Sequence, residues 1–174
     1  MRGADERAFT EYVGERLPAL RRVAYLLCGD SHRADDLVQV TITKLYTHWR
    51  RASAVANLDA YVRSMLVKTF LSEQRLGWMK RIRLVGTPAD APVVPAPEGP
   101  DVETRTVVRA ALRRVPPRAR AVLVLRFLLD LPVAEVAQLL GCSEGNVKSQ
   151  TSAGLETLRR LLGGSQLALA GRER

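Results

Sequence analysis

The sequence predicts an all-α protein built from two small helical domains that a proline-rich linker joins. Apolar residues recur at steps of three and four along most of the chain, which is the spacing of one helix face. No run alternates as a strand does, and no Asn-Gly hairpin signal occurs. Five of the nine prolines lie within residues 86–100, where they are incompatible with a helix or a central strand. The predicted boundaries are 1–83 for the first domain, 84–103 for the linker, 104–164 for the second domain and 165–174 for a tail.

Three helices are expected in the first domain. The first ends at Gly29, after which Asp30 and Ser31 can cap the second. Residues 50–59 then break the apolar pattern, and Asn57 is a suitable cap for the third helix. The three apolar stripes consist of Phe9, Tyr12, Val13, Leu17, Leu20, Ala24 and Leu27, then Ala34, Leu37, Val38, Thr41, Leu45 and Trp49, and then Tyr61, Val62, Met65, Thr69 and Leu76.

The second domain has the same pattern of apolar stripes, on shorter helices. Pro116 and Pro117 separate its first two stripes, and Pro132 opens a short helix that Gly141 ends. The stripes consist of Val108, Ala111, Leu112 and Val115, then Ala121, Val122, Leu125, Leu128 and Leu129, then Val133, Val136, Ala137 and Leu140, and finally Val147, Leu155, Leu158, Leu161 and Leu162.

Residues 134–150, AEVAQLLGCSEGNVKSQ, have the pattern of a helix-turn-helix. Gly141 can adopt the left-handed conformation that ends the first helix, and Ser143 can cap the second. In this motif the second helix enters the major groove of DNA and its first residues reach base edges. The polar residues that open this helix offer donors and acceptors suited to bases and phosphates. A plain helical hairpin is the alternative interpretation.

Positive charge is concentrated in two blocks of a chain whose formal net charge is +9. Residues 50–83 carry eight basic and two acidic side chains, and residues 105–126 carry seven basic and no acidic ones. Two such blocks favour a polyanionic partner. In the second block Arg118, Arg120 and Arg126 are suited to DNA phosphates beside the groove, although ordinary solvated charges are the alternative.

Several function classes are not expected. Cys28 and Cys142 have no CxxC partner, and His32 and His48 lie outside any ligand cluster, so neither disulfides nor a metal site is predicted. No Gly-rich phosphate loop and no nucleophile with a placed base occur, which predicts a non-enzyme without a cofactor. The N-terminus lacks the apolar stretch of a signal peptide, and no apolar run approaches the roughly 18 residues of a membrane span. A cytoplasmic protein is expected.

Three segments resemble the extracytoplasmic-function (ECF) family of RNA polymerase sigma factors, in particular its actinobacterial SigE-like branch. They are LPVAEVAQLLGCSEGNVKSQTSAGLETLRRLL in the second domain, and ADDLVQVTITKLYTHWRR and NLDAYVRSMLVKTFLSEQRLGWMKR in the first. The resemblance covers nearly the whole chain. It implies a protein that binds core RNA polymerase and directs it to promoters, and it leaves room for an anti-sigma factor as a further partner.

The resemblance also implies roles for particular residues. The first domain would dock on the polymerase clamp through Asp35, Asp36, Gln39 and Lys44, although the two aspartates also suit the first turn of a helix. It would bind the −10 element through Asn57, Tyr61, Arg63 and Lys68, because a flipped base needs edge contacts and a stacking wall and a single strand needs cations. Tyr61 is alternatively a core residue. The second domain would meet the polymerase flap with its earlier helices and read the −35 element through Ser143, Asn146, Lys148, Ser149, Gln150 and Ser152.

The chain departs from the family pattern at three positions. Val40 stands where many members have Glu, and Gln150 and Ala153 stand where basic residues are frequent. The −35 preference of other members is therefore not expected to transfer.

Two other interpretations compete with a sigma factor. A stand-alone helix-turn-helix regulator would bind as a dimer to a palindrome with half-sites about one helical turn apart. A helical adaptor would use its basic faces to meet acidic proteins. Only a sigma factor explains a first domain that places an acidic helix start next to a basic helix with an aromatic residue.

Overall fold

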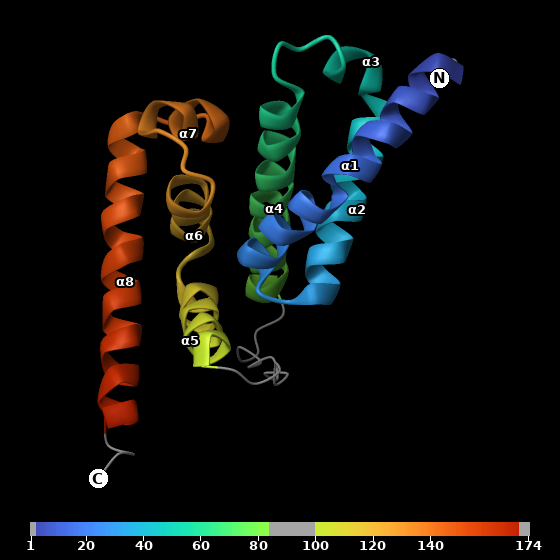
Figure 1. Ribbon diagram of the computed structural model, residues 1–174. Helices are drawn as coiled ribbons and strands as arrows, with labels where there is room; N and C mark the ends of the chain where they lie inside the picture. Colours follow the sequence, from blue (N-terminus) through green and yellow to red (C-terminus); the bar gives the residue numbers. More distant parts are fainter. Residues whose placement is uncertain (1–2, 84–99, 171–174) are drawn as a thin grey trace.

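The structure confirms the all-α prediction over the residues that it describes. This computed structural model describes residues 3–83 and 100–170, and the side chains of residues 3–76 and 106–163, so most of the predicted linker lies outside it. Within these ranges the chain has no strand (Figure 1). Its helices are α1 (Gly3–Cys28), α2 (Ser31–Thr47), α3 (Trp49–Ala52), α4 (Leu58–Arg83), α5 (Pro100–Arg114), α6 (Pro117–Leu123), the π-helical turn η1 (Val124–Leu128), α7 (Val133–Leu140) and α8 (Glu144–Ala170).

The helix ends of the first domain follow the predicted capping residues. Gly29 ends α1 with a φ of 70°, and the Oδ1 of Asp30 accepts the N–H of Arg33 at 2.9 Å to cap α2. At the start of α4 the Oδ1 of Asn57 accepts the N–H of Ala60 at 2.9 Å. Short polar side chains therefore cap the starts of α2 and α4.

The core of the first domain is formed by the predicted stripes of α1, α2 and α4. Leu27, Leu37, Leu45, Leu66 and Phe70 are fully buried. The segment predicted to be irregular contains the short helix α3, which buries Trp49 and Ala52. The assignment of Leu76 to the third stripe is wrong, because its side chain is exposed.

The π-helical turn η1 changes which residues of the second domain face the core. The N–H of Leu129 donates to the carbonyl of Val124 at 3.1 Å, five residues back, so this turn holds one residue more than an α-helical turn. The extra residue rotates the apolar pattern, and the expectation that Leu128 is buried is therefore wrong. Phe127 and Leu128 are 55% and 52% exposed.

The last helix approaches α6 closely at a glycine. A Cβ on Gly154 would lie 2.8 Å from the Cδ1 of Leu123 and 3.4 Å from the Cβ of Ala119, both buried in α6. Helix α8 continues to Ala170, beyond the domain end predicted at residue 164.

The two domains pack against each other, with α1–α4 on one side and α5–α8 on the other (Figure 1). Their buried residues form one hydrophobic cluster, which includes Leu27 and Phe70 of the first domain and Leu112, Val115 and Val136 of the second. Helices α1 and α4 of the first domain supply the side that contacts the second.

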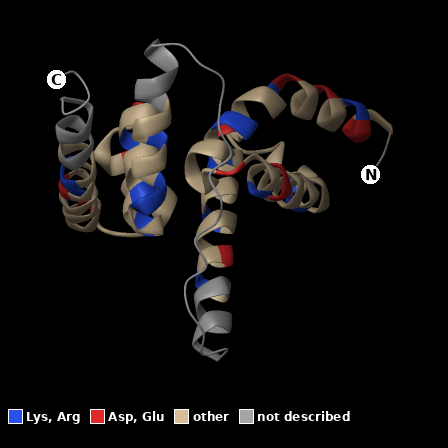
Figure 2. Ribbon diagram, turned by 90° about the horizontal axis from the view of Figure 1, so that it is seen from below, with Lys and Arg blue, Asp and Glu red and all other residues tan. Residues whose placement is uncertain are grey.

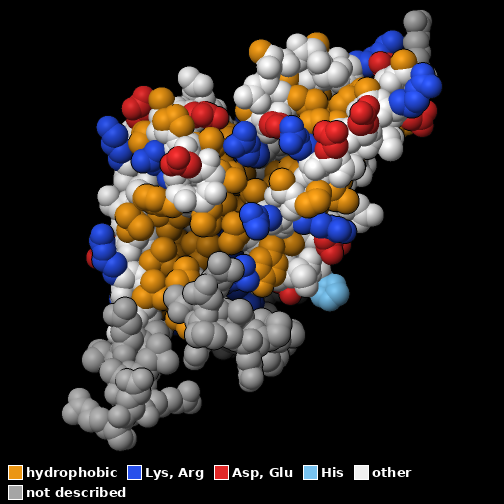
Figure 3. Space-filling view, viewed as in Figure 1, with side chains coloured by type: hydrophobic (Ala, Val, Ile, Leu, Met, Phe, Trp, Pro, Cys, Tyr) orange, Lys and Arg blue, Asp and Glu red, His pale blue; other side chains and the backbone are white. Residues whose placement is uncertain are grey.

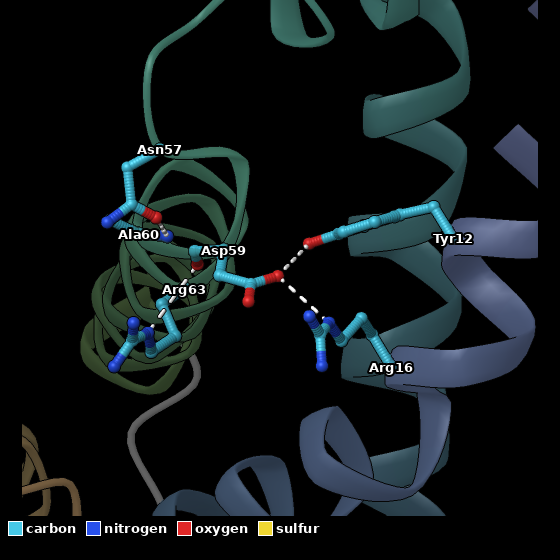
Figure 4. Close-up of polar contacts among 6 residues, drawn as sticks. All are labelled: Tyr12, Arg16, Asn57, Asp59, Ala60 and Arg63. Atoms are coloured by element: carbon cyan, nitrogen blue, oxygen red, sulfur yellow. Dashed lines mark hydrogen bonds and ion pairs between the residues drawn. The ribbon is translucent and has the colours of Figure 1, made fainter. Parts of the chain in front are cut away.

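A polar contact braces the start of α4 against α1. The Tyr12 hydroxyl donates to the Oδ1 of Asp59 at 3.0 Å, and the Nε of Arg16 lies 3.1 Å from the same oxygen (Figure 4). Burial raises the pKa of Tyr12 well above its ordinary value, and the hydrogen bond to Asp59 and that residue's negative charge raise it further. The contact fixes the first turn of α4.

Alkaline pH should weaken the native fold through Tyr12. Above about pH 10 this phenol loses its proton in the unfolded chain but keeps it in the folded one, so the free energy of unfolding falls as pH rises. In an alkaline titration we expect one rise in phenolate absorbance before the chain unfolds and a second rise that accompanies unfolding. Tyr12→Phe should lower the second rise and leave the first phase, before unfolding, unchanged. A loss confined to the earlier phase would contradict the raised pKa.

Gly154→Ala tests the close approach of α6 and α8. Alanine improves helix propensity by up to about 1 kcal/mol, whereas overpacking a buried contact costs about 1–3 kcal/mol. We expect net destabilisation in urea unfolding, because Leu123 is itself buried. Gly163→Ala in the same helix, where no atom lies within 4 Å of the added Cβ, is the control and should be neutral or stabilising. Equal effects of the two substitutions would show that the approach is not tight.

Candidate nucleic-acid interface

The predicted helix-turn-helix is present and well capped. Gly141 adopts the left-handed conformation with φ 63° and ψ 46°, and the N–H of Cys142 donates to the carbonyl of Ala137 at 3.0 Å. The Oγ of Ser143 accepts the N–H of Asn146 at 3.2 Å and caps α8. Val136 and Val147 are fully buried and join the two helices. The turn therefore holds the start of α8 in a fixed direction.

The residues predicted to read bases project from this start into solvent. Gln150 is half-buried, and the others are exposed: Ser143, Asn146, Lys148, Ser149 and Ser152. The first turn also exposes Glu144, whose carboxylate suits the positive end of the helix dipole. This surface offers neutral donors and acceptors with one cation.

The residues predicted at the −10 element lie on the first three turns of α4 and differ in accessibility. Asn57 and Lys68 are exposed, whereas Tyr61 and Arg63 are half-buried. The side-chain oxygen of Asn57 already accepts the bond that caps the helix, so its NH₂ group is what remains to donate to a ligand (Figure 4). Tyr61 packs partly against the core, in agreement with the core alternative, and its role at the −10 element stays a prediction.

The residues predicted to dock on polymerase lie on α2. Asp35, Asp36 and Gln39 are exposed, and the Oδ1 of Asp35 is 3.0 Å from the Nε of Arg21. Lys44 is exposed but lies at the edge of this face, where its Nζ donates to the Oγ1 of Thr69 at 3.1 Å. Val40, one of the departures from the family pattern, is 39% exposed.

The prediction that Arg120 contacts a DNA phosphate is wrong. Its side chain is only 8% exposed, and its guanidinium donates to three backbone carbonyls, those of Leu27, Arg113 and Val115. Burial lowers the pKa of Arg120 to about 10, which still leaves it charged at neutral pH. The carbonyls replace the water that this cation has lost.

The other two arginines predicted near phosphates differ from each other. Arg118 is exposed. Arg126 is half-buried, and its Nη1 donates to the carbonyl of Leu131 at 2.7 Å, so it is directed at the protein. Helices α5 and α6, which pack beside α8, carry mainly basic charge, whereas acidic residues gather on α1 near the N-terminus (Figure 2).

Sequence reasoning missed a hollow between the domains. Apolar side chains of α1 and η1 line it, and three cations, Arg16, Arg22 and Arg63, surround them together with Asp59. Orange side chains follow this junction in Figure 3. The charged residues interspersed in the α1 stripe were the one sequence signal for this hollow. The sequence could not predict the hollow itself, because the approach of η1 to α1 depends on how the domains pack.

The described residues bear on metal binding, thiol reactivity and membrane spans. No group of three His, Cys, Asp or Glu among them could hold a metal ion. Burial raises the pKa of the Cys28 thiol to about 11, which makes it a poor nucleophile. None of the described helices is long and apolar enough to cross a membrane.

Comparisons with known proteins agree with this arrangement. Residues 12–79 match the model of Sigma-70 region 2, and residues 105–158 match that of Sigma-70, region 4. The chain is 31% identical to the RNA polymerase sigma-E factor of Streptomyces coelicolor, over 88% of this chain and 85% of the relative. It is 32% identical to the Streptomyces avermitilis protein of the same name, over 95% and 91%.

A solved structure also resembles both domains together. It is the sigma factor RpoE of Bartonella quintana in complex with the anti-sigma factor NepR, with a TM-score of 0.73, 26% identity, and coverage of 90% of this chain and 98% of that one. From two region matches and two relatives above 30% identity, we conclude that the chain belongs to the extracytoplasmic-function family of RNA polymerase sigma factors and is of SigE-like type.

Proposed function

We propose that this sigma factor selects promoters through three separate surfaces, two for DNA and one for core RNA polymerase. Sigma factors direct promoter-specific initiation and are not themselves enzymes, and this chain has both of the regions by which they do so. The observation that carries the proposal at residue level is the capped, polar start of α8, which is exposed on a rigid helix-turn-helix.

The start of α8 reads the −35 element. Helix-turn-helix proteins place this end of the second helix in the major groove, and Asn146 and Gln150 have amides that can pair with base edges. Lys148 adds a cation, and Arg118 supplies a phosphate contact from the start of α6. These contacts need no movement of the second domain, because the side chains already face solvent.

The start of α4 captures the −10 element. Asn57 and Tyr61 offer edge contacts and an aromatic face for an extruded base, and Arg63 and Lys68 offer cations for the strand. Strand opening is then driven by the binding free energy of captured bases, since no bond chemistry is involved.

The exposed face of α2 docks on the polymerase clamp. Asp35, Asp36 and Gln39 form a compact polar face with Lys44 at its edge, and the apolar Val40 lies beside them. Helices α5 and α6 meet the flap. An anti-sigma factor is proposed as a further partner, on the likeness to the Bartonella complex. The chain acts where the polymerase is, in the cytoplasm.

Reconstituted transcription tests the proposal as a whole. We expect specific initiation only when core polymerase and this chain are combined, and weak binding of the free chain to duplex promoter DNA. A tight, symmetric footprint by the free chain, with no effect on core polymerase, would instead support a dimeric regulator.

Lys148→Ala tests −35 recognition. If Lys148 contacts a base, holoenzyme binding should weaken by about 1–3 kcal/mol and discrimination at one −35 position should relax. If it contacts a phosphate, the loss is smaller and uniform across sequences, and the salt dependence becomes shallower. The matched control is Arg159→Ala, an exposed cation farther along α8. An equal loss of promoter binding in both variants would argue against a role of Lys148 in reading DNA.

Asp36→Arg tests docking through α2. Reversing an exposed charge at an interface costs complementarity, so we expect core affinity, measured by fluorescence polarisation, to fall by about tenfold. Glu11→Arg makes the same change on the exposed surface of α1 and should leave core affinity unchanged. Unaltered binding by Asp36→Arg would remove this face from the docking surface.

A further inference from the structure

The hollow between α1 and η1 has the size and the lining of a small-molecule site. Its volume is about 590 Å³, and sites for small ligands are typically about 300–1,000 Å³. Leu20 and Val23 of α1 line it and also belong to the hydrophobic core. Leu128 and Leu129 supply the wall from the second domain. The inner surface is therefore mainly apolar, as such sites usually are.

The π-helical turn leaves part of this apolar wall open to solvent. Because η1 holds one residue more than an α-helical turn, Leu128 is directed away from the core and is 52% exposed. An exposed leucine still has apolar surface that a ligand can remove from water. Single π-helical turns within α-helices occur frequently at functional sites.

Three arginines surround the apolar walls, and their charge exceeds that of the acidic lining. Among the described residues Asp59 is the one acid that lines the hollow. It is already engaged by the Tyr12 hydroxyl at 3.0 Å and by the Nε of Arg16 at 3.1 Å (Figure 4). With Arg22 and Arg63, the lining has three cations and one carboxylate, a formal net charge of +2.

Two of these arginines are not neutralised by the protein. Within the described part of the chain, neither Arg22 nor Arg63 forms an ion pair. Arg22 is exposed, and the Nε of Arg63 donates to the carbonyl of Asp59 in its own helix at 3.5 Å. The charges of Arg16 and Arg63 both lower the pKa of Tyr12, against larger effects that raise it. Cations from α1 and α4 thus act on one point of the lining.

The volume favours a small ligand over a protein segment. A helix with its side chains is about 10–12 Å across and rises about 5.4 Å per turn, so one turn alone occupies roughly 400–600 Å³. The hollow has room for about one turn, which is too little for the apolar face of an amphipathic helix. A nucleic-acid strand would suit the arginines but would gain little from aliphatic walls, because bases stack on aromatic side chains.

We propose that this hollow binds a small anionic amphiphile, with an alkyl chain and a carboxylate head, as a free monomer. The chain lies against the leucine and valine walls, and the head meets Arg22 together with Arg16 or Arg63. The planar guanidinium fork matches a carboxylate with two parallel hydrogen bonds. A site between two domains accepts a monomer from solution and not the surface of a bilayer. The site is independent of the functions proposed for the DNA and polymerase surfaces.

Calorimetric titration of the full-length chain with decanoate, below its micelle concentration, tests the site directly. We expect saturable binding of one molecule per chain, and about fourfold tighter binding for each CH₂ added from octanoate to decanoate. Decyltrimethylammonium, with the same chain and the opposite charge, should not bind. Equal binding of the cationic probe, or no dependence on chain length, overturns the proposal.

Arg22→Glu tests the charged rim without changing any residue proposed to contact DNA or polymerase. Decanoate binding should weaken by at least about tenfold, because a charge-assisted hydrogen bond is replaced by repulsion. The matched control is Arg7→Glu, at an exposed arginine of the same helix that does not line the hollow. Equal affinities of the two variants for decanoate overturn the proposal.

Leu128→Gln tests the apolar wall. Its control is Phe127→Gln, because Phe127 is the neighbouring residue, is 55% exposed and does not line the hollow. We expect Leu128→Gln to weaken decanoate binding by at least about fourfold and Phe127→Gln to leave it unchanged. Both positions are exposed, so both variants should keep the helical circular dichroism of the parent. Should either unfold, the comparison of Arg22→Glu with Arg7→Glu decides alone.

Two further measurements distinguish other occupants of the hollow. Vesicles of phosphatidylglycerol should not carry the chain in flotation, and a synthetic acidic amphipathic helix should not compete with decanoate. Flotation that Arg22→Glu abolishes, in a chain that does not bind decanoate, would identify a membrane surface and overturn the proposal. Binding of the peptide that both Arg22→Glu and Leu128→Gln abolish, again without decanoate binding, would identify a protein-docking surface and overturn it equally.

Discussion

A buried guanidinium links the two halves of this protein beside the hydrophobic cluster that they share. Removing a cation from water costs several kcal/mol unless close acceptors replace its hydration, and Arg120 finds those acceptors at the ends of two helices. The carbonyl of Leu27 belongs to the first domain, so part of this compensation exists only while the domains touch. Separation would return that side of the guanidinium to solvent, which makes the contact reversible. The rest of the interface is organised around this point, with Phe70 beneath it and Arg109 beside it.

The relation between packing and accessibility follows from which helices face inward. Helices α1 and α4 face the second domain, whereas the outer surface of α2 is directed away from it. The exposed face of α2 therefore lies clear of the second domain, whereas Ser64 of α4 contacts α7 and its neighbours Tyr61 and Arg63 are half-buried. The start of α8 is also available, because the helix-turn-helix contacts the first domain through α7. Of the two surfaces proposed for DNA, the one at the start of α8 is exposed at all of its proposed base-reading residues but Gln150, whereas at the start of α4 only Asn57 and Lys68 are exposed.

Much of the fold could be predicted from the sequence because local rules determine it. Short polar side chains begin helices and glycine ends them whatever surrounds them, and four residues do so here: Asp30, Asn57, Gly141 and Ser143. The exposure of the α8 residues followed from the same turn. Periodicity failed at Leu128, because it assumes a constant number of residues per turn and η1 contains one more.

Arg120 is the instructive failure of sequence reasoning. Its position in a basic block, with no acidic residue nearby in the chain, is typical of an arginine that meets phosphate. Its acceptors are backbone carbonyls, which every residue has, so no sequence pattern predicts them. The nearest one across the boundary lies 93 positions away in the chain. Tyr12 and Asp59 were missed for the same reason, since they are 47 positions apart and only the packing of α1 on α4 brings them together.

Each of the two proposed DNA surfaces is held in shape by contacts within its own domain. At the start of α8 the capping bonds and the buried pair Val136 and Val147 all lie within the second domain, so domain separation leaves this surface intact. At the start of α4 the brace from Tyr12 and Arg16 lies within the first domain, and the same argument applies. Opening therefore needs to break only the contacts across the boundary. We therefore expect each proposed reading surface to keep its own shape, and a partner such as core polymerase to set the distance between the two.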